Sequence, residues 1–215
     1  SCLSLLLKEL GVHMGNKLVG YHGGEAVGLA NICELLYPFP STEASLPDDN
    51  VHRRMSNWVN ARRREAMERR TIAGGKYPHL CAMGHHLVNI CGEDLRVIHS
   101  SRPLEESIRS LQNRMLKSGR ATLDQCEDVQ RFLHSHKTKF LEENEHVSIE
   151  YSDMLEDPLR QVDVICDYLG ISPSATQIDN ALAVVDPSRR TVSDARNAET
   201  LVPSNTPVAN VRGCC

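Results

Sequence analysis

The spacing of apolar residues predicts a chain of helices interrupted by two short strands. Apolar positions recur at helical intervals in residues 1–10, 25–37, 51–70, 80–91, 103–114, 123–143, 158–170 and 174–185. Short apolar runs at residues 95–99 and 146–151 are typical of strands instead. Strands separated by helices favour a parallel sheet with helices on both faces, so we predict an α/β fold.

The segment of residues 95–114 is the most informative part of this pattern. Its apolar run stops at Arg102 and Pro103 and restarts as an amphipathic helix. A strand that feeds a helix in this way places Arg102 and the unpaired N–H groups of the helix where they favour a phosphate or sulfate. The Ser110 hydroxyl reaches the same region if the ligand lies along the first two helical turns. Arg102 and Ser110 are therefore candidate anion-binding residues.

The domain organisation follows from the two ends of the chain. Residues 1–194 predict one domain, and residues 195–215 form a polar tail rich in Asn, Ser, Thr and Pro, for which we expect little order. Residues 1–10 are a leucine-rich helical segment that starts with almost no polar lead-in. A buried helix needs a cap and something to pack on, so we expect the domain to be truncated at its amino terminus.

Composition and charge limit the classes of partner that the chain is expected to bind. The 215 residues include 40% hydrophobic and 24% charged residues, with a formal net charge of -4. This charge argues against generic nucleic-acid binding, which requires a basic face. No run approaches the roughly 18 apolar residues of a membrane span, and residues 1–10 lack a signal-peptide pattern. We therefore expect a soluble cytoplasmic protein without nucleic-acid or membrane partners, and its oligomeric state stays open.

Eight cysteines and a histidine-rich segment raise the question of metal or redox chemistry. None of the cysteines has C-x-x-C spacing, and most lie among apolar residues, so we interpret them as reduced. His79, Cys81, His85 and His86 could form a metal site on paper. However, adjacent histidines on a helix point about 100° apart, which argues against a shared ion. We predict no metal.

Two basic segments have competing interpretations. Residues 51–70 carry seven arginines, which form either the solvated face of a helix or a guard over an anionic ligand. Residues 11–18, Gly-Val-His-Met-Gly-Asn-Lys-Leu, look like a degenerate phosphate-binding loop. They lack the four-residue glycine spacing, the Ser or Thr after the lysine and the preceding strand of a Walker loop, so we reject that interpretation.

The order of these segments, over about residues 1–191, resembles the sulfotransferases that use 3′-phosphoadenosine 5′-phosphosulfate. The motifs that carry the resemblance are Leu10-Gly-Val-His-Met-Gly15, Lys76-Tyr-Pro, Arg102-Pro-Leu-Glu-Glu-Ser-Ile-Arg-Ser110, Glu150-Tyr-Ser-Asp-Met-Leu-Glu-Asp-Pro158, Tyr168-Leu-Gly-Ile171 and the Arg189-Arg190 pair. The resemblance implies a P-loop NTPase-like sulfotransferase fold. It also implies that Arg102 and Ser110 bind the cofactor's 3′-phosphate and that Arg189 and Arg190 help to close the site.

The resemblance further implies sulfuryl transfer to a hydroxyl or amine of a small-molecule or saccharide acceptor. The family's 5′-phosphosulfate loop should precede the first helix, and Ser1 is at best a remnant of it. Glu25, His22, His13 and His79 are candidates for the catalytic base. The seven arginines favour an acidic acceptor. Two alternatives remain, an inactive homologue that only binds the nucleotide and, less favoured, a phosphotransferase of P-loop ancestry.

Overall fold

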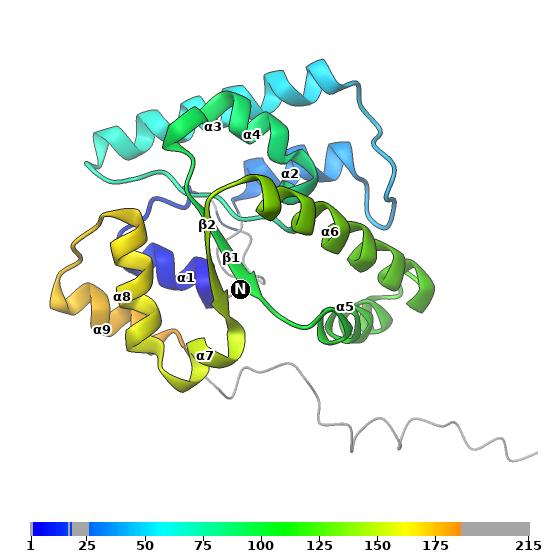
Figure 1. The fold of residues 1–215 in the computed structure, drawn as a ribbon. Coiled ribbons are helices and arrows are strands. Elements are labelled where there is room, and N and C mark those ends of the chain that lie inside the picture. Colours follow the sequence, from blue (N-terminus) through cyan, green and yellow to red (C-terminus); the bar gives the residue numbers. More distant parts are fainter. Residues whose placement is uncertain (1, 17, 19–25, 186–215) are drawn as a thin grey trace, which may run out of the picture.

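A computed structural model describes residues 2–16, 18 and 26–185. Within them the chain is mostly helical, with one small sheet (Figure 1). The elements in chain order are α1 (Cys2–Glu9), α2 (Val27–Leu36), α3 (Asp48–Glu68), η1 (Pro78–Met83), α4 (Gly84–Cys91), η2 (Gly92–Asp94), β1 (Val97–Ser101), α5 (Leu104–Ser118), α6 (Leu123–Glu143), β2 (His146–Glu150), α7 (Tyr151–Glu156), α8 (Pro158–Leu169) and α9 (Ala175–Ala183).

The two predicted strands pair in parallel, with Val97 opposite His146 and Ser101 opposite Glu150. β1 begins two residues later than the apolar run suggested, because Leu95 still belongs to a turn and donates its N–H to Gly92 O at 3.2 Å. The strand also extends into the polar residues Ser100 and Ser101, because they pair with Ile149 and Glu150 of β2. The predicted mixed α/β architecture with a parallel sheet is confirmed within the described residues.

The sheet has one apolar and one polar face, because side chains alternate along each strand. Ile98, Val147 and Ile149 belong to a cluster with α1, α8 and α9. These three helices lie together on one side of the strands, and α5 and α6 lie on the other (Figure 1). The opposite face is polar except for Val97 and carries Val97, His99, Ser101, His146, Ser148 and Glu150. The expectation of apolar strands is therefore correct for only one face.

Local sequence signals explain where several helices begin and end. An aspartate directly before a proline, as in Asp157-Pro158, predicts a helix cap followed by a first helical turn. The structure confirms this prediction, since the Asp157 carboxylate accepts the N–H of Arg160 at 3.2 Å. α5 and α8 end at Gly119 and Gly170, both with φ of 64°, a left-handed conformation that favours glycine.

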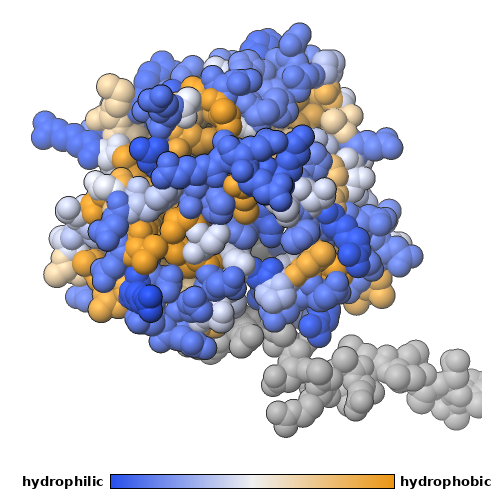
Figure 2. Space-filling model, viewed as in Figure 1, coloured by the Kyte–Doolittle hydropathy of each residue, from blue (hydrophilic) through white to orange (hydrophobic). Residues whose placement is uncertain are grey.

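Two further apolar clusters hold the helical layers together. Leu29, Met55 and Met83 lie in the cluster that joins α2, α3 and η1. Leu111 and Val129 represent the cluster between α5 and α6. The face seen in Figure 2 is largely hydrophilic, with apolar patches between polar side chains. Among the described residues, no helix is both long and apolar enough to cross a membrane.

A close approach joins α4 to α6 at Gly84. Gly84 has helical angles, φ -55° and ψ -40°, and an added Cβ would lie 2.2 Å from Cδ2 of Phe140. We predict that Gly84→Ala displaces the Phe140 ring and lowers the free energy of unfolding by about 1–3 kcal/mol, measured by urea denaturation.

Gly28 in α2 provides the matched control, since its added Cβ would meet Trp58 no closer than 3.4 Å. Gly28→Ala should leave stability unchanged or raise it by up to about 1 kcal/mol through helix propensity. Equal effects of the two substitutions would contradict the importance of the Phe140 contact.

Candidate functional site

The polar face of the sheet forms one wall of a cavity of about 550 Å³. The opposite wall comes from α6, where residues three and four positions apart lie on one helical face. The polar and charged lining residues are His99, Ser101, Arg102, His134, Lys137, Thr138, Glu142, His146 and Glu150. The cavity therefore lies between the polar face of the sheet and α6, and its lining extends from His146 at the start of β2 to Arg102 just after β1.

Arg102 lies directly after β1 and before α5. Its Nε is 3.6 Å from Glu106 Oε2, and its guanidinium carbon is 5.1 Å from the centre of the Tyr151 ring. Nε is also buried and has no hydrogen-bond partner. Buried polar atoms are normally paired, and this Nε has an ion-pair contact with Glu106 but no hydrogen bond. The guanidinium therefore keeps hydrogen-bonding capacity for an anionic group in the cavity, which would have to share it with the Glu106 carboxylate.

His99 is a functional candidate that the sequence analysis missed. Its Nδ1 is 3.2 Å from Ser148 Oγ, and its Nε2 is buried without a hydrogen-bond partner. Burial, followed by the positive charge of Lys137, lowers the pKa of His99 to about 4. The imidazole is therefore neutral near pH 7. The overlooked signal was the alternation of polar residues along both strands.

The structure separates the two predicted phosphate ligands. Arg102 lines the cavity, whereas Ser110 lies half-buried on α5 and is not among the lining residues. Ser110 is next to Leu111, which packs against α6 in a different cluster.

His79, a predicted catalytic base, lies outside this cavity. It is only 5% exposed and stacks with Tyr37 and Tyr77, with ring centres 5.8 and 5.6 Å away. Both ring nitrogens are buried without a hydrogen-bond partner, and burial lowers the pKa of His79. Its packing is that of a core histidine, and its catalytic role stays a prediction.

His13, another candidate base, has a clear structural partner. Its Nε2 lies 2.8 Å from Glu65 Oε2, and the other Glu65 oxygen accepts from Arg62 Nη2 at 2.6 Å. The hydrogen bond with His13, supported by Arg62, lowers the pKa of Glu65. This triad ties the segment after α1 to α3.

Other arginines of the basic helix also bond within the chain. Arg53 donates to Asn50 Oδ1 at 2.9 Å, Arg63 lies 3.3 Å from Asp94 Oδ2, and Arg69 donates to Asn16 Oδ1 at 3.0 Å. These contacts favour the interpretation of α3 as a solvated surface helix. The acidic acceptor inferred from its arginines stays a prediction.

Several predicted site residues lie outside the described residues. These are the candidate bases His22 and Glu25, the cofactor residues Arg189 and Arg190, and Ser1. The predicted tail of residues 195–215 lies outside them as well.

The four residues that the sequence suggested as a metal group on paper do not all lie together in the structure. His79 stacks in the core, but the adjacent His85 and His86 both approach Asp48. The expected divergence of adjacent histidines therefore does not keep this pair apart, since Nε2 of His85 and of His86 lie 3.3 and 3.2 Å from the same Asp48 Oδ1 atom. The absence of a metal stays a prediction.

Comparisons of the chain with protein-family models, curated proteins and solved structures find no match. The geometry of the cavity, with Arg102 at one end and His99 in its wall, therefore carries the functional interpretation.

The depressed pKa of His99 generates a prediction about stability and pH. Folded His99 takes up its proton near pH 4, whereas an unperturbed histidine does so near 6.5. Between these values the unfolded chain binds more protons, so the contribution of His99 to stability is lost as the pH falls through this window. His99→Gln should therefore lose less stability than the wild type on acidification from neutral pH to about 4.

Chemical denaturation across this pH range measures the difference directly, and an NMR titration of the His99 ring reports its pKa independently. Parallel stability curves for the two proteins, together with a ring pKa near 6.5, would show that burial does not control this histidine.

Proposed function

We propose that this chain is the nucleotide-binding part of a sulfotransferase that uses 3′-phosphoadenosine 5′-phosphosulfate. The carrying observation is the position of Arg102, directly after the carboxyl end of β1 and in the lining of the cavity, with a buried Nε that makes no hydrogen bond and lies 3.6 Å from Glu106 Oε2. Open α/β sheets commonly bind ligands at this edge. The cavity volume of about 550 Å³ suits a small-molecule site.

The charges around the cavity support a specific orientation of the nucleotide. Arg102 and Lys137 are cationic, whereas Glu142 and Glu150 are acidic, so the lining is not uniformly basic. A phosphate is best accommodated at the Arg102 end, where the guanidinium can donate charge-assisted hydrogen bonds. The carboxylates suit hydroxyl groups of a ribose, which they can bind as acceptors.

The bound cofactor would supply the sulfuryl group, and the chain would have to accept a proton from the acceptor. His99 is neutral and faces the cavity, but a pKa of about 4 makes it a weak base near neutral pH. We therefore assign it hydrogen bonding within the site. His22 and Glu25 stay the proposed bases.

A second candidate function is nucleotide binding without sulfuryl transfer. It is favoured by the position of His79, which stacks in the core and does not line the cavity. The two candidates share the Arg102 site and differ only in turnover.

Calorimetric titration with 3′-phosphoadenosine 5′-phosphate and with adenosine 5′-monophosphate tests the shared site. The wild type should bind the 3′-phosphorylated nucleotide more tightly. Arg102→Ala should weaken its binding about ten- to a hundredfold, because a charged hydrogen bond is lost, and should leave the two nucleotides with similar affinities.

Arg109→Ala is the control, since Arg109 is exposed on α5, the helix that follows Arg102, and its Nε donates to the Glu105 carbonyl at 3.4 Å. No binding by the folded wild type, or equal losses in the two variants, would contradict the proposal. Turnover of the sulfated cofactor with a hydroxyl or amine acceptor would then separate the enzyme from the binding protein.

A further inference from the structure

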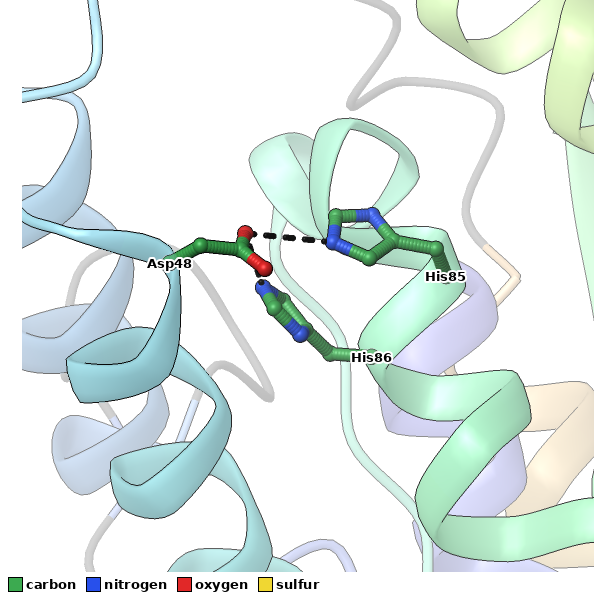
Figure 3. A group of neighbouring side chains, drawn as sticks. All are labelled: Asp48, His85 and His86. Carbon is green, nitrogen blue, oxygen red and sulfur yellow. Dashed lines mark hydrogen bonds and ion pairs between the residues drawn. The ribbon is translucent and has the colours of Figure 1, made fainter.

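A second polar cluster lies between α3 and α4. Asp48 begins α3, and His85 and His86 follow Gly84 at the start of α4. Asp48 Oδ1 is 3.3 Å from His85 Nε2 and 3.2 Å from His86 Nε2. Figure 3 shows both rings directed at the carboxylate. Within the part of the chain that the structure describes, one ligand atom from each residue lies within 4.8 Å of the others.

These separations match those in a metal site. Zinc binds imidazole nitrogen and carboxylate oxygen at about 2.0–2.2 Å, so neighbouring ligands in a tetrahedron lie about 3.3 Å apart. Both Asp48–histidine distances already have this length. A single ion could therefore be reached by small side-chain rotations.

Burial and charge make the three groups suitable ligands. The His86 side chain is 3% exposed, and its Nε2 is directed at the Asp48 carboxylate, so this ligand atom is held in place by packing. His85 and Asp48 are 59% and 76% exposed, so an ion could enter from solvent. His52, one turn after Asp48, has its ring centre 5.5 Å from that of His86.

We propose that Asp48, His85 and His86 bind one zinc ion, with a fourth position open to water or to an external ligand. Two imidazoles and one carboxylate are a donor set that zinc favours, and three protein ligands are typical of sites with an open position. The proposal is independent of the sulfotransferase function, because none of the three residues lines the cavity beside Arg102.

The thiol of Cys81, four residues before His85 in the sequence, is not part of this group. Burial raises the pKa of Cys81 to about 11, so its sulfur keeps its proton near neutral pH. Sγ also lies 3.2 Å from the carbonyl oxygen of Pro78, to which it donates.

Titration of the full chain with Zn²⁺, and separately with Co²⁺, tests the site. The wild type should bind one ion, and the cobalt form should show visible absorption typical of a tetrahedral site without a sulfur-to-metal charge-transfer band. Asp48→Asn and His85→Ala should each weaken binding at least about tenfold. Both positions are exposed, so the fold should survive these substitutions, which far-UV circular dichroism checks.

Asp49→Asn is the matched control, since Asp49 is the exposed neighbour of Asp48 in the first turn of α3. It should bind zinc as the wild type does. The proposal is overturned if the wild type binds no ion, if Asp48→Asn and His85→Ala retain wild-type affinity, or if a sulfur charge-transfer band shows cysteine ligation.

Discussion

The parallel pairing of β1 and β2 is the constraint on which the rest of the structure depends. Two parallel strands cannot be joined by a tight turn, so the chain must cross from the end of one to the start of the other. Here α5 and α6 make that crossing. The crossing starts at Arg102 and brings α6 over the sheet, so the same connection that permits the pairing also builds the cavity.

The two faces of this sheet have opposite energetic roles. Burial of Ile98 and Ile149 against α1, α8 and α9 removes apolar surface from water and stabilises the fold. His99 Nε2 on the other face and Arg102 Nε just after β1 are buried without a hydrogen bond, although the Glu106 carboxylate lies 3.6 Å from the arginine atom. Such atoms reduce stability unless something bonds to them. Burial of the apolar face therefore offsets the loss of folding free energy that the unbonded polar atoms cause. A binding site on a rigid scaffold typically divides these roles between two faces in this way.

The sequence predicted the features that depend on neighbouring residues. Apolar periodicity located the helices, and Asp157 before Pro158 predicted a cap that the structure confirms. The position of β1 was less accurate, because its final residues, Ser100 and Ser101, are held by pairing with β2 and not by their own apolar character. The polar face went unnoticed because it appears only when both strands are compared in register.

Site residues were also hard to predict where they meet through contacts between residues far apart in the sequence. Arg102 could be predicted as a cavity residue because its position is set by the local connection between one strand and the next helix. The contact between Asp48 and His85 could not be predicted, because it depends on how α3 packs against α4. Helical geometry alone predicts that adjacent histidine side chains diverge, but in the structure both Nε2 atoms reach the same carboxylate oxygen of Asp48.

The contact between Gly84 and Phe140 connects these two parts of the molecule. Gly84 directly precedes His85, and Phe140 lies on α6 one turn beyond Lys137, which lines the cavity. Interiors are close-packed, so a shift of the Phe140 ring must be transmitted to its neighbours. The absence of a Cβ at Gly84 therefore sets the distance between α4 and α6, and with it the placement of both the histidine pair and one wall of the cavity.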